Sequence, residues 1–513
     1  MGITSQINAW QEKIQTRYSP KLLSWLAIAF AVTLRIVQYF HNRSLWADEA
    51  VLALNIIDRN YLQLLQPLDY NQGAPIGFLW VEKLAIQVLG DSEYAFRLFP
   101  FLCGIISIFL FYDLAKRGLK HYGIPIALAF FGVLEYLVYY TSELKQYSSD
   151  VAIALGLAWL TQDFIRRELT PKYIAIYGMI GAVAIWFSHP AVLVAGGFAI
   201  FSLVKVWKTR EFKKLPQLFA IFATWGVSFI SFYLVSIQSL AANETLRESW
   251  RKAFPSELTD INWLVDKWQD LFQNPLGFEK SLVNLGIAVF FIGIFSLFRR
   301  HRQTLAFVSS PILATLLATY LHQYPFRNRL LLFLIPFIIL LFAEGIYYIG
   351  KKTYLKFSAL PTILIFGLFA IAPLSHSIEL LSNPIEREEI RPVLTYIKEH
   401  KKPGDLLYIF QRGEYQFQYY APKFGYAEGD YIVGVDDLED GKEVSSEEWE
   451  RYTADFDALQ GNPRVWLLFS HVDKFDEERE RVLGYIDSLG TKLDRFDRTG
   501  AFVCLYDFSN EAQ

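Results

Sequence analysis

Long apolar blocks limit what this chain can fold into more than any other feature of its sequence. Hydrophobic residues make up 53% of its 513 residues. They are concentrated in about eleven blocks of roughly 17 to 25 residues, the length that a helix needs to cross about 30 Å of hydrocarbon. The chain is therefore predicted to be a polytopic α-helical membrane protein. The predicted spans are residues 21–40, 95–115, 124–141, 147–165, 172–188, 190–206, 216–238, 281–298, 304–321, 329–349 and 355–376.

Lysine and arginine residues are concentrated at alternate ends of these spans. Because cytoplasmic loops carry an excess of these residues, we expect these ends and the N-terminus to face the cytoplasm. An odd number of spans then places the C-terminal tail outside, so we expect a multi-pass protein of the inner (plasma) membrane. Residues 1–20 contain no small-residue cleavage site, so the first apolar block is predicted to be a retained helix. The basic segments are residues 116–120, 166–167, 205–214, 299–302 and 351–352.

Three long segments are predicted to lie outside the membrane: residues 41–94, 239–280 and 377–513. We therefore predict a transmembrane domain at 1–376, with its first outer loop at 41–94, and an extracytoplasmic α/β domain at 377–513. Two segments of the first outer loop, residues 48–66 and 75–89, have apolar residues at helical spacing but are too polar to span. They are predicted to be amphipathic helices that lie in the membrane interface.

The C-terminal tail has the alternating pattern of an α/β domain. Helices are predicted over 390–400 and 414–420, and buried strands over 405–410, 464–469 and 501–506. Such alternation favours a sheet with helices packed on it. The tail has no glycine-rich phosphate loop and no cysteine–histidine metal pattern. The two cysteines of the chain, Cys103 and Cys504, do not indicate a disulfide framework.

The acidic pair Asp48 and Glu49 follows closely on the first predicted span. Two adjacent carboxylates at a membrane surface can act as a general base and as a ligand for a cation or a substrate. The structural alternative is that Asp48 caps the following helix and Glu49 favours its first turn. Both interpretations can hold together, because a capping carboxylate can also be catalytic.

A second polar cluster, residues 140–150, connects the third and fourth predicted spans on the outer side. If the fourth helix begins near Gln146, then Glu143, Gln146, Tyr147 and Asp150 approach one face of it. The structural alternative is a solvated turn in which the side chain of Lys145 reaches toward the headgroups. A carboxylate such as Asp150 fits that alternative least, because at the start of a span it is costly unless it is paired.

Isolated charged and polar residues at three more places could also contribute chemistry. His189 lies at an outer junction of two spans, where a lone histidine is more often structural than a ligand. Arg327 and Arg329 follow Tyr324 on the outer side, and guanidinium groups suit phosphate oxygens; the alternative is headgroup anchoring. Arg35 lies inside the first predicted span and is expected to pair with a carboxylate or a phosphate.

Most of these residues map to one predicted side of the membrane, whereas the cytoplasmic loops offer little besides positive charge. Carboxylates beside cations on one face suit a reaction in which an acceptor is deprotonated while a phosphate leaves. The residues concerned are Asp48, Glu49, Glu143, Lys145, Asp150, His189, Arg327 and Arg329.

The sequence resembles the GT-C glycosyltransferases, and within them the glycosyltransferase-39-like group. That group includes protein O-mannosyltransferases, the aminoarabinose transferase of lipid A and bacterial lipopolysaccharide-core transferases. The resemblance covers about residues 20–350 and rests on the order and spacing of several motifs. These motifs are Arg35 and residues 44–50, 72–80, 90–104, 143–147 and 324–329.

The resemblance implies an inverting glycosyltransferase with a polyprenyl-phosphate sugar as donor. The acceptor would be an envelope glycan, lipid or protein at the outer face of the membrane, and no nucleic-acid partner is expected. Asp48 would be the general base, and Glu49 would assist it or bind the acceptor. Some members of the group need a divalent metal and others do not, so Asp48 and Glu49 are also candidate metal ligands.

The resemblance also implies roles for the remaining polar residues. Oriented cations stabilise the charge that develops on a departing phosphate. Lysine stands at position 145 where the family often has arginine, so the charge is kept but the guanidinium fork is lost. The expected phosphate-binding residues are Lys145, Arg327, Arg329 and Arg35. The expected substrate-binding residues are Glu143, Gln146, Tyr147, Asp150, His189 and Tyr324.

Two other classes of function compete with the enzyme. A transporter or flippase for lipid-linked sugars would place ionisable residues and broken helices near the bilayer midplane, often in two related halves. Here the ionisable residues gather at one side, and no related halves are evident. A non-catalytic assembly subunit of the envelope would use its tail to bind a partner and would not need Asp48.

Overall fold

The computed structural model of the chain describes residues 19–357, 360–435, 444–472 and 476–509. Residues 1–18, most of the segment in which we predict no cleavage site, lie outside that part. The chain divides by its contacts into two units. We name these the membrane unit, Met1–His41 with Arg59–Pro384, and the tail unit, Asn42–Asp58 with Ile385–Gln513. The predicted division differs in two respects: part of the first outer loop groups with the tail, and the boundary follows Pro384.

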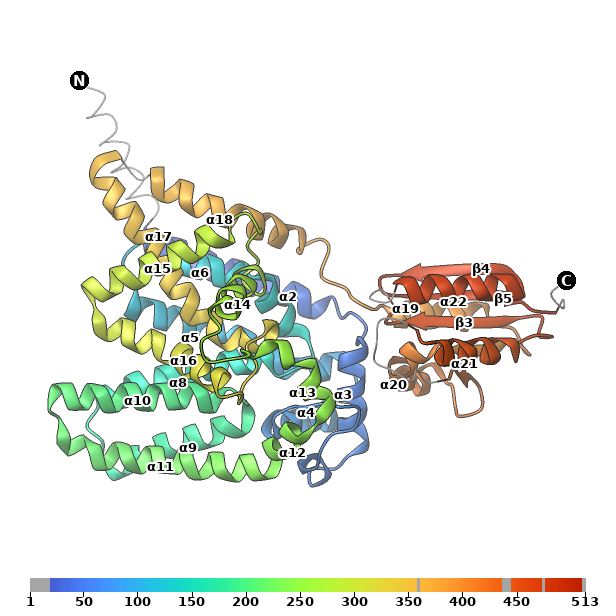
Figure 1. Cartoon of the computed structure of the whole chain (residues 1–513), viewed down its shortest axis with the longest axis horizontal. Helices are drawn as coiled ribbons and strands as arrows, with labels where there is room; N and C mark the ends of the chain where they lie inside the picture. Colours follow the sequence, from blue (N-terminus) through green and yellow to red (C-terminus); the bar gives the residue numbers. More distant parts are fainter. Residues whose placement is uncertain (1–18, 358–359, 436–443, 473–475, 510–513) are drawn as a thin grey trace, which may run out of the picture. The chain divides into compact units, whose positions relative to one another are not determined.

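Apolar helices form the membrane unit (Figure 1). In the described part of the chain, eight segments are long and apolar enough to cross a membrane, or nine if one bent pair counts as a span. The chain is thus a multi-pass membrane protein. The long helices are α2 (Pro20–Phe40), α5 (Glu93–Gly118), α10 (Ala191–Thr209), α11 (Leu215–Phe232), α15 (Val283–Arg300), α16 (Arg302–Tyr320), α17 (Ile335–Phe357) and α18 (Leu360–Glu379).

Three predicted spans take a different form from the rest. The span predicted at 124–141 is broken into α6 (Gly123–Val133) and a segment from Glu135 to Ser142, bent by 63°. The spans predicted at 147–165 and 172–188 are the helices α8 (Tyr147–Arg166) and α9 (Pro171–Phe187), which do not meet the same criterion of length and apolar character. Polar residues within α8 and the 17-residue length of α9 account for this.

Short helices connect the spans. The amphipathic helix predicted at 48–66 is α3 (Ala47–Asp58), followed by the 3-10 helix η1 (Gln63–Leu65). It ends early because the Asn60 side chain accepts hydrogen bonds from the backbone N–H groups of Leu62 and Gln63, which turns the chain. The remaining connecting helices are α4 (Ile76–Leu89), α7 (Glu135–Tyr139), η2 (Tyr140–Ser142), η3 (Phe212–Lys214), η4 (Tyr233–Ile237), α12 (Gln238–Ala242), α13 (Glu244–Ser249), η5 (Arg251–Ala253), α14 (Ile261–Gln273) and η6 (Asn328–Leu334).

Small residues allow two of the spans to pack backbone against backbone. A Cβ atom added at Gly293 of α15 would lie 1.8 Å from the carbonyl oxygen of Leu341 in α17. A Cβ atom added at Gly345 of α17 would lie 2.0 Å from the carbonyl oxygen of Val289. Close approach of this kind is a common basis of helix association in membranes, where lipid and side chains are equally apolar.

The tail unit contains a five-stranded mixed sheet in the order β2-β1-β3-β5-β4. The first three strands in this order are parallel, and β5 pairs antiparallel with both β3 and β4. The strands are β1 (Leu406–Ile409), β2 (Ile432–Val433), β3 (Val465–Ser470), β4 (Thr491–Arg498) and β5 (Ala501–Asp507). The helices are α3 together with α19 (Ile390–His400), η7 (Gln411–Gly413), α20 (Glu414–Phe424), α21 (Ser446–Asp457) and α22 (Asp476–Leu489).

Helices cover both faces of this sheet. On one face, Leu467 and Cys504 pack with Phe456 of α21 and Ile486 of α22 in one buried cluster. Trp466, which directly precedes Leu467 in β3, points to the opposite face of the sheet. On that face, α19 packs on β4 and β5. The α/β prediction is confirmed, and so are the three predicted strands. Strand β4 was not predicted because its sequence, Thr491 to Arg498, is mostly charged and exposed at the sheet edge.

A buried carboxylate, Asp405, fixes the start of β1. Its oxygens accept hydrogen bonds from Arg464 Nε at 2.8 Å, Trp466 Nε1 at 2.9 Å and the backbone N–H of Lys402 at 2.9 Å. Burial raises the pKa of this carboxyl group, but the three donors and the charge of Arg464 lower it more, so the pKa lies below its ordinary value.

Candidate active site

The acidic pair of the first outer loop lies in the tail unit, at the start of α3. Asp48 and Glu49 occupy the first turn of this helix, where the backbone N–H groups favour negative charge. Asp48 is partly exposed, whereas the Glu49 side chain is buried. The Asp48 carboxylate is therefore accessible to a reactant. The Glu49 carboxylate can contact only neighbouring protein groups.

Glu49 forms an ion pair with a residue that sequence reasoning missed. Arg43 Nη2 lies 3.8 Å from Glu49 Oε2, and both side chains are almost completely buried. In the described part of the chain, no group of three or more His, Cys, Asp or Glu side chains could hold a metal ion. Two carboxylates, one already paired with an arginine, are a poor ligand set for a divalent cation. We therefore assign no step to a metal.

In the membrane unit, the connection between α7 and α8 carries a buried cation. Lys145 is 5% exposed, and its Nζ donates a hydrogen bond of 2.7 Å to Gln72 Oε1. Glu143 is completely buried in the same connection. The turn is thus buried in protein, contrary to the solvated turn that was the structural alternative.

The first turn of α8 brings several predicted residues together. The guanidinium carbon of Arg329 lies 5.5 Å from the centre of the Tyr147 ring. The Tyr324 hydroxyl donates to the carbonyl of Leu330 at 2.7 Å. Burial, and after it the neighbouring Asp150 and Tyr147, raise the pKa of the Tyr324 phenol well above its ordinary value. Tyr147, Asp150, Tyr324 and Arg329 therefore form one polar group.

Two buried acceptor atoms near the start of α8 have no hydrogen-bond partner among the described residues. They are Gln146 Oε1 and Asp150 Oδ1. Buried polar atoms in folded proteins are nearly always hydrogen-bonded, so these two acceptors suit a donor supplied by a water molecule or a ligand. This is the chemistry expected of a substrate-binding region.

Three predicted residues make contacts of another kind. Arg327 is exposed and donates to the carbonyl of Ser249 at 2.9 Å. His189 is partly buried and stacks on Phe232 with ring centres 5.6 Å apart. Arg35 is completely buried inside the membrane unit. Its guanidinium donates to the backbone carbonyls of residues 31, 131 and 132 at 3.0 to 3.4 Å. These carbonyls take the place of the expected carboxylate or phosphate, so we leave Arg35 out of the proposed donor site.

Another buried carboxylate of the membrane unit, Glu82, was missed by sequence reasoning. It lies on α4, is completely buried, and neither carboxylate oxygen has a hydrogen-bond partner in the described part of the chain. Burial raises its pKa well above the ordinary value. The available signal was its position on the apolar face of a helix, four residues after Phe78.

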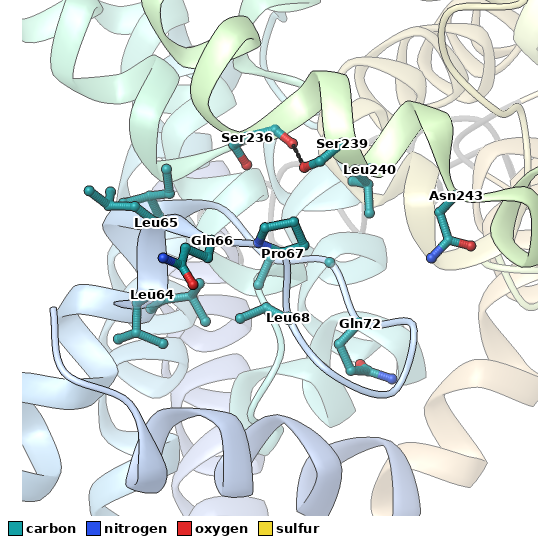
Figure 2. A pocket seen from close by; sticks show the side chains of 14 residues that line it. Leu64, Leu65, Gln66, Pro67, Leu68, Gln72, Ser236, Ser239, Leu240 and Asn243 are labelled. Carbon is teal, nitrogen blue, oxygen red and sulfur yellow. Dashed lines mark hydrogen bonds between the residues drawn. The ribbon is translucent and has the colours of Figure 1, made fainter. Parts of the chain in front are cut away.

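A small pocket of about 50 Å³ lies beside Gln72, the partner of Lys145. Figure 2 shows Leu64, Leu65 and Leu68 on one side, and Ser236 and Leu240 on another. The lining is thus mainly aliphatic with a few amide and hydroxyl groups, which is typical of sites for small or lipidic ligands.

Comparison with known families matches residues 73–235 to the family described as dolichyl-phosphate-mannose-protein mannosyltransferase. Comparison with curated protein sequences gives no match.

Solved structures share the fold over most of this chain. ArnT from Cupriavidus metallidurans bound to undecaprenyl phosphate matches with a TM-score of 0.52 and 12% identity, covering 94% of this chain and 97% of ArnT. The archaeal oligosaccharyltransferase AglB from Archaeoglobus fulgidus, in complex with an inhibitory peptide and a dolichol-phosphate, matches with a TM-score of 0.51 and 11% identity. That match covers 96% of this chain and 75% of AglB. The chain is therefore similar to the mannosyltransferase family over residues 73–235, and it shares its fold with the structures of ArnT and AglB.

Proposed function

We propose that this protein is an inverting glycosyltransferase that uses a polyprenyl-phosphate sugar as donor. The acceptor is an envelope glycan, lipid or protein at the outer face of the inner membrane. The observation that carries the proposal is a GT-C fold with a partly exposed Asp48 at the first turn of a helix outside the spans. The undecaprenyl phosphate of the ArnT structure and the dolichol-phosphate of the AglB structure support the class of donor.

Asp48 acts as the general base in this mechanism. Its carboxylate takes the proton of an acceptor hydroxyl or amine while the acceptor atom attacks the anomeric carbon of the sugar. The bond from that carbon to the phosphate oxygen breaks, and polyprenyl phosphate leaves with the electron pair. The bond from the acceptor to the sugar forms on the opposite face, so the configuration is inverted. Glu49, held by Arg43, fixes the first turn that carries the base.

Cations of the membrane unit stabilise the phosphate that departs. Lys145 is buried, so its charge acts with little screening by water. Arg329 lies at the polar group around Tyr147 and supplies a guanidinium for phosphate oxygens. Aliphatic side chains beside Gln72 offer apolar contacts to the isoprenoid units next to the phosphate. Arg327, which is exposed two residues before Arg329, adds a further positive charge for the phosphate.

The acceptor and sugar are bound by the unsatisfied polar atoms near the start of α8. Gln146 and Asp150 offer buried acceptor oxygens to sugar hydroxyl groups. Glu143, Tyr147 and Tyr324 are the other proposed substrate-binding residues of this region. His189 stays a predicted substrate residue, although its stacking on a phenylalanine ring fits a structural role equally well.

Loss of the base is the first test of this proposal. Purified protein in detergent is given a panel of radiolabelled polyprenyl-phosphate sugars, and consumption of each donor is measured. We expect Asp48→Asn to lower the rate by at least about a hundredfold, the usual contribution of a general base. Asp58→Asn, at the exposed end of the same helix, should keep the wild-type rate. Full activity of Asp48→Asn would refute the assignment of the base.

The buried lysine gives a second test. We expect Lys145→Met to lower kcat/KM by about 10²- to 10³-fold, as the loss of a group that stabilises developing charge does. Lys145→Arg should keep part of the activity, because the charge remains. Lys172→Met, which removes an exposed lysine at the start of α9, should have no effect. Equal activity of the two Lys145 variants would refute a role of its charge.

The same donors distinguish the enzyme from a transporter. If folded wild-type protein consumes no donor in detergent, it is reconstituted in vesicles that carry the labelled donor in both leaflets. Movement of donor between leaflets that depends on the protein would then contradict the glycosyltransferase proposal and favour a flippase.

A further inference from the structure

The tail unit has the type of sheet edge at which α/β domains bind ligands. Strand β1 lies between β2 and β3, and the three strands are parallel. The chain leaves β1 toward β2 on one side and reaches β3 on the other. Ligands of open α/β sheets bind outside the carboxyl ends of the strands at such a switch point. Here Gln416 of α20 follows β1, and His471 follows β3.

The occupant of this edge is a segment of the same chain, Asn42–Ala47, which directly precedes Asp48. The Gln416 amide donates to the carbonyl of Leu45 at 2.9 Å, and the backbone N–H of Leu45 donates to the Tyr420 hydroxyl at 2.8 Å. The Ser470 hydroxyl, at the end of β3, donates to the other side of the same Gln416 amide. Leu45, Gln416, Tyr420 and Ser470 are all buried.

Two carboxylates of the tail accept hydrogen bonds from two more backbone N–H groups of this segment. Glu389 accepts from the backbone N–H of Ser44 at 3.0 and 3.1 Å and from its hydroxyl at 2.9 Å. Glu388 Oε2 accepts from the backbone N–H of Ala47 at 2.9 Å. Ala47 is the first residue of α3, so this N–H is one of the donors that a helix start leaves without an intrahelical partner.

The two carboxylates are themselves fixed by the sheet. His471 Nδ1 lies 2.7 Å from Glu388 Oε1. The backbone N–H of Glu389 donates to the carbonyl of Thr499 in the turn between β4 and β5. A Cβ atom at Gly500 of that turn would lie 2.1 Å from the Arg387 carbonyl oxygen, so residues 387–389 pack directly against the hairpin. Glu388 and Glu389 are less than 10% exposed.

We propose that Glu388 and Glu389 are positioning residues for Asp48, and that the tail unit uses its ligand-binding sheet edge to hold the catalytic loop. This inference rests on the proposed function for the role of Asp48, but the clamp itself rests only on the contacts above. Glu388 caps α3 in place of a local side chain, and the capped residue is the neighbour of Asp48. A shift of that turn moves the base relative to its reactant, and small misplacements of a reacting group have large effects on rate.

Backbone exchange tests the clamp independently of activity. Hydrogen–deuterium exchange of the full-length protein in detergent is followed for peptides within residues 42–58. We expect Glu388→Ala to speed exchange there by about fivefold to tenfold, the effect of losing a helix cap. Glu388→Gln keeps an acceptor oxygen and should restore most of the protection. Glu450→Ala, an exposed glutamate of α21, serves as the matched control and should change nothing. Unchanged exchange in Glu388→Ala and in Glu389→Ala would overturn the clamp.

Steady-state kinetics then test positioning of the base. We expect Glu388→Ala to lower kcat by about tenfold or more while KM for the lipid donor stays within about twofold, because donor affinity does not depend on the base. Glu388→Gln should recover at least half of the lost kcat on a logarithmic scale. Rates are expressed per folded protein. The folded amount is the fraction of each variant that elutes as a single species and melts at the wild-type temperature. An unchanged kcat, or an equal loss in both variants, would overturn the positioning role.

The two readouts separate the inference from the proposed function. If wild-type protein shows no transferase activity but exchange at 42–58 rises in Glu388→Ala, the proposed function fails and the clamp stands. If wild-type protein is active and neither exchange nor kcat changes in the variants, the proposed function stands and the positioning role is refuted.

Discussion

Removal of Arg43 should be costly to the tail unit because its ion pair with Glu49 is buried. Arg43 and Glu49 are 1% and 0% exposed, with 3.8 Å between nitrogen and oxygen. At an effective dielectric constant of about 20, this distance corresponds to about 4 kcal/mol of attraction. Removal of one partner of a buried pair typically costs about 3–5 kcal/mol, because the other charge stays buried. We therefore expect Arg43→Met to lower the free energy of unfolding of the tail unit by about 3–5 kcal/mol.

Cys504 provides an assay specific to this unit. Its thiol is completely buried in β5, and burial raises its pKa to about 11, so it reacts with a thiol reagent only when the unit opens. Peptide mass spectrometry separates it from Cys103, which belongs to the membrane unit. A unit of about 150 residues loses roughly 3 °C per kcal/mol, so the labelling midpoint of Arg43→Met should fall by about 10 °C.

Two comparisons can refute this reasoning. The ion pair of Arg479 and Asp476 is shorter, at 2.7 Å, but its side chains are 26% and 64% exposed. Arg479→Met should therefore cost less than about 1 kcal/mol. The double variant Arg43→Met/Glu49→Gln removes both charges and should recover at least half of the loss. If Arg43→Met costs no more than Arg479→Met, or if the double variant is as unstable as the single one, burial of the pair does not govern its contribution.

Two further predictions concern packing and pH. Gly293→Ala places a Cβ atom against the Leu341 carbonyl oxygen and should lower the melting temperature in detergent, at a cost of about 1–3 kcal/mol, whereas Gly196→Ala, with no atom within 4 Å, should not. Equal melting temperatures of Gly293→Ala and wild type would contradict the close packing of α15 on α17. The folded-state pKa of Asp405 lies below 3.8, so its stabilisation is present above pH 3.8 and is lost as pH falls through the folded-state value. Asp405→Asn should therefore be about 2 kcal/mol less stable than wild type at pH 7, and the difference between the two midpoints, followed by tryptophan fluorescence, should shrink below pH 3.8. A difference that does not depend on pH would show that charge is not the cause.

Local patterns predicted most of the helices and strands. Apolar blocks marked the spans because a helix in hydrocarbon must be apolar along its whole length. Helix α19 was predicted with its observed bounds, Ile390–His400, because its apolar residues recur at helical spacing. The prediction of about eleven spans exceeded the eight or nine found among the described residues. The excess arose at α8, which contains polar residues, at α9, which is only 17 residues long, and at the bent segment near Val133.

The candidate site was predicted less completely than the fold. Asp48, Lys145 and the residues around Tyr147 were identified from charge and position in the sequence. Glu82 was missed, although its place on the apolar face of an amphipathic helix, four residues after Phe78, indicated that it would be buried. The contacts of Arg35 could not be inferred from its position alone, since its guanidinium donates to backbone carbonyls of α2 and α6.

The sequence by itself determined that the chain crosses a membrane several times and carries an α/β tail. These are consequences of composition and periodicity, which each segment carries without reference to the others. Only the tertiary structure decided that residues 42–58 belong with the tail, and that Glu389 accepts hydrogen bonds from Ser44, 345 positions away. A buried polar group takes its partner from whichever segment packs against it, and that choice is a property of the whole fold.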